Sequence, residues 1–448
     1  MNYHHSPRRT FPENHVFIEE DLARLKPQDV YKWMCFKAYG MEDPSQDDTP
    51  LMRSTSIMYW KKAISHFMNT TAKWNEAAQS GNPTQSKLVN SLIKVVKRAE
   101  TRGHGVPSKA ERPYTIREFH ALLKLLPNEK MRAFANFQYH LMGRSDDIAR
   151  VKKKHLKAST EFEGFLTTKI CWSKNVINES NSPTQILLGS KDPEMCVYLN
   201  LAIFLEKWIQ YGDGAMSQWL FCEGNTTDAS PFKDQDYEAI LGKRAFARAV
   251  RNAVDHASFE RDYDGLLGTH SIRKSSVTEC RKKGAKKDDV DYRGRWKTVT
   301  RMQDRYTDVQ LNWPDVEMAS LLCQEGCIKY KVKSELGLTD TWLCTNVTPN
   351  ISSTFGRKVG AILAKSLLWA VYNPTWSEKV QPDIRHRIIS ACIRKDVPDD
   401  VNPVDRVQVV ATEGEIPTTT TAVLLVYIQL TNCCFCTRMN RWRNCEFG

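Results

Sequence analysis

The sequence predicts a mainly α-helical protein with a small β-sheet, which places the fold in the α+β class. Through residues 20–102, apolar residues recur at steps of three and four, the spacing of helices that bury one face. Helix boundary signals recur in three later segments, residues 115–123, 130–142 and 269–284. Residues 165–174 have the pattern of a strand that enters a turn, and residues 185–188 are the expected return strand.

Composition and pattern divide the chain into five regions. They are a flexible N-terminus (1–19), a helical domain (20–102), a Gly/Pro/Ser-containing linker (103–111), a larger domain (112–330) and a C-terminal region of unknown role (331–448). A length of 448 residues is sufficient for two or three domains with sizeable cores.

Local signals justify the individual elements of the larger domain. Thr115 and Glu118 form a predicted capping box that begins its first helix. The helix over 269–284 is predicted to begin at a Thr269 cap and to stop at Gly284. Three later segments also look helical, residues 318–331, 366–372 and 383–395. The first of these either docks in a neighbouring protomer or packs on its own domain.

The charge balance indicates a polyanionic partner. The formal net charge is +12, and residues 273–305 contain twelve Lys and Arg against five Asp and Glu. Such a concentration favours salt-sensitive binding to nucleic acid. The basic residues expected to contact DNA are Lys61, Lys62, Lys152, Lys153, Lys154, Lys274, Arg281, Lys282 and Lys283. Solvated helix faces and a nuclear import signal are the alternatives.

Several classes of protein are excluded on sequence grounds. The N-terminus lacks the apolar core of a secretory signal, and the longest late apolar run, residues 422–430, is too short to cross a bilayer. Thirteen cysteines are expected to be reduced in an intracellular protein. The clusters at 323–327 and 433–445 lack partners at zinc-finger spacing, so no metal site and no cofactor are predicted.

One ordered set of residues points to phosphodiester chemistry. Arg144 and Arg273 could hold the non-bridging oxygens of a phosphate through bidentate guanidinium contacts, which a Lys cannot match. His270 stands three residues before Arg273, so both lie on one face of the predicted helix. Each residue alone also has an ordinary interpretation, as a surface His or a helix-end salt-bridge partner.

A tyrosine downstream completes the set. Tyr306 lies in a short amphipathic stretch and would serve as a covalent nucleophile, leaving a phosphotyrosine linkage that a free hydroxyl can reverse without ATP. Lys174, at the predicted turn, is the expected general acid for the leaving 5′ oxygen, with Lys169 as the alternative. Tyr292 is a second tyrosine nearby, but it precedes Trp296.

This array resembles the catalytic domain of the tyrosine recombinases, the phage-integrase superfamily, and most of all its Crypton transposon branch. The resemblance covers roughly residues 112–313. Its most specific pieces are the segments 143–147, 269–273 and 291–296, followed by Tyr306. It implies a tyrosine recombinase catalytic domain preceded by a helical domain that clamps DNA.

The resemblance also implies roles for individual residues. Arg144 and Arg273 would clamp the scissile phosphate, and His270 would assist proton transfer. Asp147 matches the acidic residue that supports the site three places after the first Arg. Trp296 matches the His/Trp position that packs on or bonds to the phosphate.

Two features depart from the family pattern. Tyr306 stands ten positions after Trp296, slightly more than the common spacing, and Arg295 replaces the usual His beside Trp296. The Lys that the family places in a β-hairpin turn corresponds to Lys174 or to Lys169.

The implied function is metal-independent breakage and rejoining of DNA through a 3′-phosphotyrosine intermediate, in site-specific recombination or transposition. Double-stranded DNA would be the partner, and a homotetramer on DNA the active species. We expect no membrane partner and no small-molecule substrate. In a eukaryote, we expect the protein to be located in the nucleus. Two alternatives remain, a domesticated DNA-binding protein without catalysis and a type IB topoisomerase-like enzyme.

Overall fold

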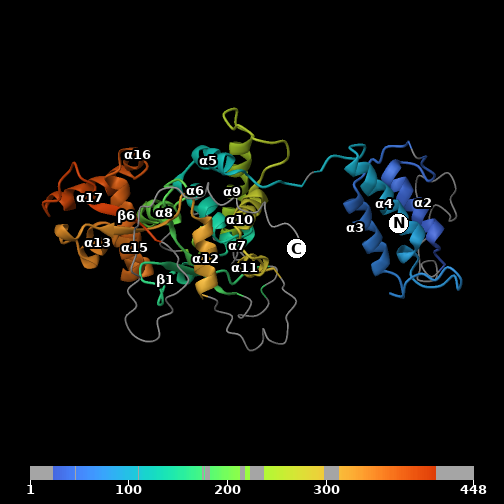
Figure 1. Cartoon of the computed structure of the whole chain (residues 1–448), viewed down its shortest axis with the longest axis horizontal. Coiled ribbons are helices and arrows are strands. Elements are labelled where there is room, and N and C mark those ends of the chain that lie inside the picture. The colour runs from blue at the N-terminus through green and yellow to red at the C-terminus, as the bar shows by residue number, and fades with distance from the viewer. Residues whose placement is uncertain are drawn as a thin grey trace, which may run out of the picture. The chain divides into compact units, whose positions relative to one another are not determined.

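The computed structural model describes residues 24–45, 47–108, 110–173, 176, 182–211, 217–221, 237–296 and 312–409. The chain divides between Ala110 and Glu111 into two units (Figure 1). Helices dominate both units, and the second also contains two small antiparallel sheets. The predicted class, mainly α with a small β component, is therefore confirmed. The predicted flexible segment 1–19 and the cysteine cluster at 433–445 lie outside the described residues.

The first unit is built from helices that share one apolar core. Its elements are α2 (Pro27–Tyr39), α3 (Ser54–His66), the 3-10 turn η1 (Pro83–Gln85) and α4 (Lys87–Thr101). The α4 helix begins at the Ser86 cap, whose Oγ accepts a hydrogen bond from the Val89 N–H at 3.2 Å. Leu92 and Val96 continue its buried face, which packs against α2 and its buried Met34. This spacing is the one that predicted the helix.

The second unit begins with helices around the predicted catalytic residues. Its helical elements are α5 (Ile116–Leu125), α6 (Glu129–His140), α7 (Ser145–Ala149), η2 (Lys153–His155), α8 (Val197–Tyr211), α9 (Tyr237–Val254), α10 (Thr269–Lys282), α11 (Lys287–Arg293), α12 (Asn312–Leu322), η6 (Ser334–Leu336), α13 (Asp340–Asn346), α14 (Pro349–Phe355), α15 (Arg357–Val371), α16 (Pro374–Ser377) and α17 (Pro382–Ile393). The Thr115–Glu118 capping box at the start of α5 is confirmed.

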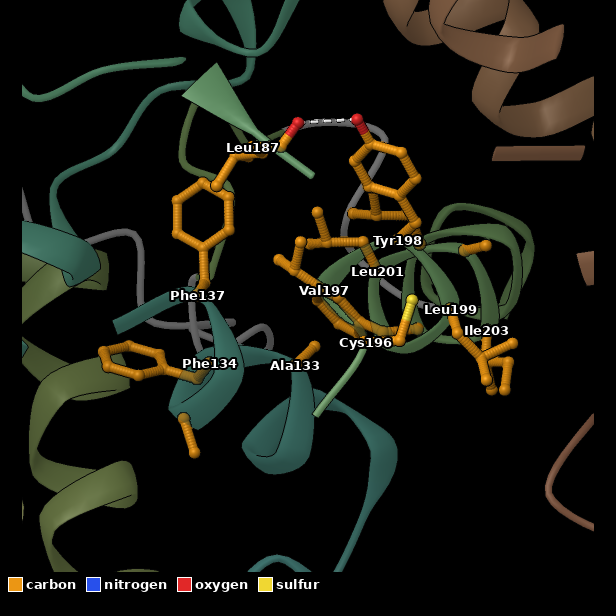
Figure 2. Packing of buried hydrophobic residues seen from close by; sticks show 14 of the residues in the cluster. Ala133, Phe134, Phe137, Leu187, Cys196, Val197, Tyr198, Leu199, Leu201 and Ile203 are labelled. Carbon is orange, nitrogen blue, oxygen red and sulfur yellow. Dashed lines mark hydrogen bonds between the residues drawn. The ribbon is translucent and has the colours of Figure 1, made fainter. Parts of the chain in front are cut away.

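Helix α6 is the centre of the second unit. Its residues from Met131 to His140 are buried with the exception of Arg132, which is half-buried, and it packs against α8, α9 and α10. Phe134 and Phe137 of α6 and Val197 of α8 belong to one core (Figure 2). The Tyr198 hydroxyl on α8 donates a 2.6 Å hydrogen bond to the Leu187 carbonyl, so the same core also holds the neighbouring sheet.

Two three-stranded antiparallel sheets complete the unit. The first has the order β1 (Lys157–Ala158), β2 (Leu166–Lys169), β3 (Thr184–Leu187), and the second has the order β4 (Gly189–Ser190), β5 (Cys327–Val332), β6 (Val404–Gln408). Lys169 pairs with Thr184 across β2 and β3, so the predicted strand–turn–strand element is confirmed. The predicted helix over 318–331 is wrong beyond Leu322, because residues from Cys327 onward pair with β4 and β6.

Residues beyond 330 share the core of this unit. Helix α15 packs against α8 and β5, and its buried leucines join the cluster that contains α6. The Arg387 guanidinium on α17 contacts the buried Glu206 carboxylate on α8 at 2.7 Å. Helix α12 also packs on its own unit, against β3, α10 and α11. The described part of the C-terminal region, up to Val409, is therefore continuous with the unit that contains the predicted site.

Candidate functional site

Three guanidiniums converge on one buried carboxylate in the second unit. The Asp147 side chain is 2% exposed, and its Oδ2 lies 3.8 Å from Arg144 Nη1, 3.6 Å from Arg273 Nη1 and 3.8 Å from Arg295 Nη2. Arg273 and Arg295 are themselves buried, whereas the Arg144 side chain is 32% exposed. The structure thus brings together the two predicted clamp arginines, the predicted acidic support and a third arginine that was not predicted.

A sharp bend after α6 delivers Arg144. Met142 adopts a left-handed conformation with φ of 47°, and its N–H and that of Gly143 bond back to the carbonyls of α6. A Cβ on Gly143 would lie 2.5 Å from the buried Ile148 side chain, so a larger residue there would have to displace Ile148. Arg144 then forms the N-cap of α7, where its own N–H donates to Asp147 Oδ2 at 3.1 Å. The two residues are positioned by one local motif.

Helix α10 carries His270 and Arg273 on one face, as predicted. Its N-cap is Gly268 and not the predicted Thr269. A distant group supplies the capping interaction, since the Glu111 carboxylate accepts a 3.0 Å hydrogen bond from the Ser271 N–H. A Cβ on Gly268 would overlap this carboxylate. The predicted stop is confirmed, because the helix ends at Lys282 and Gly284 follows with φ of 92°.

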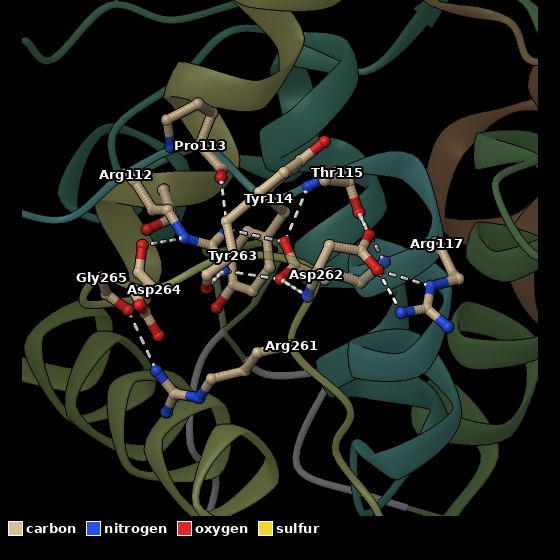
Figure 3. Close-up of polar contacts among 12 residues, drawn as sticks. Arg112, Pro113, Tyr114, Thr115, Arg117, Arg261, Asp262, Tyr263, Asp264 and Gly265 are labelled. Carbon is tan, nitrogen blue, oxygen red and sulfur yellow. Dashed lines mark hydrogen bonds and ion pairs between the residues drawn. The ribbon is translucent and has the colours of Figure 1, made fainter.

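A polar network joins the first residues of the second unit to residues 262–264, which shortly precede α10 (Figure 3). The Arg112 guanidinium donates to both oxygens of the buried Glu118 carboxylate, at 2.7 and 2.6 Å, and to the Asp264 carbonyl at 3.0 Å. Asp262 bonds to the Thr115 hydroxyl and to Arg117 in the same network. The N-terminus of α10 is therefore fixed by contacts to the first residues of the second unit.

Arg273 is positioned by a turn that follows α11. Its Nη2 donates to the Gly294 carbonyl, and its Cζ lies 4.3 Å from the centroid of the Trp296 ring. Stacking of this kind suits a guanidinium. Arg273 Nη1 is buried and has no hydrogen-bond partner among the described residues. Trp296 therefore packs on an arginine of the site, and one donor of that arginine remains available.

Among the described residues, the arginine cluster holds more positive than negative charge. Burial and the neighbouring guanidiniums of Arg295 and Arg144 lower the pKa of Arg273 to about 9. Burial likewise lowers the pKa of Arg295 to about 10, although Asp147 opposes this effect. The pKa of His270 is also lowered, chiefly by burial and by Lys274, and against the opposing charge of Glu111. A lowered pKa favours the neutral imidazole, which is able to accept a proton.

Two predicted catalytic residues cannot be located. Lys174 and Tyr306 lie outside the described residues. Lys169 is the last residue of β2, on the strand that leads toward Ser173. The Ser173 hydroxyl accepts a 3.4 Å hydrogen bond from Arg144 Nη1, so this hairpin reaches the arginine cluster.

The predicted DNA-contacting residues differ in their surroundings. Within the described ranges, the exposed ones are Lys62, Lys154, Arg281, Lys282 and Lys283. Lys274 donates to the Glu111 carbonyl, and Lys61 donates to Asn90 Oδ1 at 2.6 Å. Lys152 and Lys153 lie over tryptophan rings, at 5.0 and 5.4 Å from the centroids. These last four have structural contacts in the absence of DNA, and so do three of the exposed residues: Arg281 and Lys283 donate to main-chain carbonyls, and Lys282 pairs with Glu279.

No protein-family model matches the chain, and no curated protein sequence matches it. Across the part of the chain that the structure describes, no helix is long and apolar enough to cross a membrane. Within the same residues, no group of three or more His, Cys, Asp or Glu side chains is placed to hold a metal ion.

Sequence reasoning missed three residues that shape the site. The sequence marks Arg295 only as a departure from a family pattern, and it gives no signal for Glu111 or Ser173. Their contacts join segments far apart in the chain, and no local periodicity signals such contacts. The local signal for Arg295 was its place in the 291–296 segment of the resemblance, directly before Trp296.

Proposed function

We propose that the second unit is a DNA strand transferase of the tyrosine recombinase kind, with the arginine cluster as its phosphate site. One observation carries the proposal. Three guanidiniums share a single carboxylate, and buried Arg273 Nη1 has no hydrogen-bond partner among the described residues. A buried donor and uncompensated positive charge are costly unless an anion completes them. A phosphodiester supplies both the charge and the acceptor oxygens.

The arginine cluster is better suited to stabilise the developing charge of a transition state than to bind an unreactive anion. In attack on a phosphodiester, negative charge accumulates on the non-bridging oxygens, and fixed guanidiniums stabilise it without reorganisation. Arg144, being one-third exposed, is accessible to a duplex, while Arg273 is fixed by Trp296 and the Gly294 carbonyl. These two arginines would therefore hold the phosphate between them.

The proposed reaction balances without an external energy source. The Tyr306 oxygen attacks phosphorus and forms a phosphotyrosine bond, while the bond from phosphorus to the 5′ oxygen breaks. Neutral His270 takes the phenolic proton, and Lys174, or Lys169 in its place, gives a proton to the leaving 5′ oxygen. Attack by another 5′ hydroxyl reverses these transfers and joins the strands.

The first unit supports a DNA partner through a basic helix face. Lys94, Lys97, Arg98 and Arg102 are exposed on or just beyond α4 and line an open surface hollow. The one acidic residue of α4, Glu100, pairs with Arg53 at 3.0 Å and also accepts hydrogen bonds from Ser54, so its charge is already balanced away from this face. We propose that the face contacts the DNA backbone, and that four protomers assemble on two duplexes during recombination.

A substrate that needs no known target sequence tests the proposal. Duplex oligonucleotides of random sequence, each ending in a 3′-(p-nitrophenyl phosphate), present a phosphodiester with a good leaving group. Attack by the protein should release p-nitrophenol and leave a covalent protein–DNA adduct on a denaturing gel, in EDTA. The Tyr306→Phe variant should form no adduct but bind the duplex normally, and the Tyr292→Phe control should react like the wild type.

The other outcomes separate the alternatives. Binding of the duplex with no adduct in the wild type would favour a DNA-binding protein without catalysis. Relaxation of a supercoiled plasmid by a monomer would favour a topoisomerase-like enzyme. An adduct that forms only with added magnesium would contradict the metal-independent mechanism.

A further inference from the structure

Arg295 occupies a backbone position that normally selects glycine. Helix α11 ends at Arg293, and the N–H groups of Arg295 and Trp296 bond back to the carbonyls of Tyr292 and Asp291. This is a Schellman ending, in which the residue at the Arg295 position must be left-handed, and its φ is 56°. A large side chain there costs free energy that glycine would avoid, which makes a role for the side chain worth seeking.

The end of α6 has the same form and lies against this turn. Met142 is the left-handed residue of that second Schellman ending, two residues before Arg144. The Arg295 guanidinium donates to the Leu141 carbonyl at 3.4 and 3.5 Å and to the Met142 carbonyl at 3.5 Å. The side chain of one strained turn therefore bonds to the carbonyls of the other.

The same guanidinium also holds other parts of the site. Arg295 Nη1 donates to Gln185 Oε1 on β3 at 2.5 Å and to the Arg293 carbonyl at 3.1 Å. Its Nη2 lies 3.8 Å from Asp147 Oδ2. Because Nη1 and Nη2 of Arg295 already bond to these protein groups, this guanidinium is committed to the fold and not to a duplex.

We infer that Arg295 is a positioning residue for the proposed phosphate site, acting through Arg144 and Asp147. Its guanidinium fixes the bend that positions Arg144, and it also interacts with the Asp147 carboxylate. Asp147 is then unable to neutralise the two clamp arginines fully, so both retain charge for a phosphate. This inference rests on the proposed function and adds a residue that does not itself touch the phosphate.

A double-mutant cycle tests whether Arg295 acts through Arg144. The rate of adduct formation is measured on the random-sequence p-nitrophenyl duplexes for four proteins, the wild type, Arg295→Gln, Arg144→Ala and the double variant. Arg295→Gln should slow the wild type by roughly 10- to 100-fold, the usual cost of losing a group that orients a ligand. The rate of the double variant should be within about twofold of the Arg144→Ala rate, because without the Arg144 guanidinium there is little for Arg295 to position.

Two further variants separate positioning from folding. Arg295→Gly removes the guanidinium and also the backbone strain, so it should fold and still lose the rate. Arg387→Gln removes another guanidinium that bonds to a buried carboxylate and to main-chain carbonyls, far along the chain on α17. Its rate per folded molecule should match the wild type. The half-saturating duplex concentration should be unchanged within about twofold in Arg295→Gln, because a positioning residue affects the rate of reaction and not capture.

The possible results are distinguishable. If Arg295→Gln or Arg295→Gly reacts as fast as the wild type, the inference is wrong and the proposed function stands. An equal loss of rate in the Arg144→Ala background would also overturn it, because Arg295 would then act independently. If the wild type forms no adduct at all, the proposed function fails, and the inference fails with it.

Discussion

Removal of the Asp147 charge should strongly destabilise the second unit. At an effective dielectric constant of about 20, unit charges separated by 3.6 to 3.8 Å attract by about 4 to 5 kcal/mol. Three such contacts exist, but the exposed Arg144 contributes least because solvent screens it. Asn at position 147 also escapes the desolvation cost of a carboxylate. We therefore expect Asp147→Asn to lower the free energy of unfolding by about 3 to 5 kcal/mol, as for a broken buried pair.

Urea denaturation followed by tryptophan fluorescence measures this loss, since urea leaves ionic strength unchanged. The exposed Asp288, on α11, provides a matched control, and Asp288→Asn should change the free energy of unfolding by about 0.5 kcal/mol or less. Added phosphate should stabilise Asp147→Asn more than the wild type, because an anion replaces the missing charge. A loss below about 1 kcal/mol, or equal stabilisation of both proteins by phosphate, would refute the charge balance described for this site.

Three other predictions follow from the same packing. A Cβ at position 294 would overlap the Trp296 ring. Gly294→Ala should therefore slow adduct formation by at least about tenfold while duplex affinity is retained. An unchanged rate would contradict a role for the stacking of Arg273 on Trp296. Asp315→Asn leaves buried Arg293 without its counter-charge, so it should lower the free energy of unfolding in urea by about 3 to 5 kcal/mol. A change under about 1 kcal/mol would show that this ion pair does not stabilise the fold. Burial lowers the pKa of His140 to about 4, so the unfolded chain takes up the proton first as pH falls from about 6.5 to 4. Stability should fall by about 3 kcal/mol across that window, and the fall should be smaller in His140→Gln.

The helices and the first part of the site were predictable because their signals are local. The capping box of Thr115 and Glu118, the face shared by His270 and Arg273, and the place of Asp147 three residues after Arg144 all depend on short spacings. Such spacings act within one or two helical turns. The predicted local structures form in the folded protein because the packing around them favours the same conformations as the local sequence.

The remaining features depend on contacts between distant segments. The N-cap of α10 could not be predicted, since its carboxylate comes from Glu111, 160 residues before Ser271. The segment after Cys327 resembles a helix in a short apolar window, and only its pairing with β4 and β6 makes it a strand. Arg295 also depends on distant contacts, because its hydrogen-bond partners just after α6 and on β3 are more than 100 residues away in the chain.

The most direct test of the account is to identify the residue that carries the nucleotide in the trapped adduct. The adduct formed on the random-sequence duplexes in EDTA is digested with protease and nuclease, and its peptides are analysed by mass spectrometry. The account predicts a nucleotide phosphate on the Tyr306 peptide, formed by the wild type and by Tyr292→Phe, and greatly reduced in Arg273→Lys. A nucleotide on Tyr292 or on any other side chain, or an undiminished yield from Arg273→Lys, would contradict it.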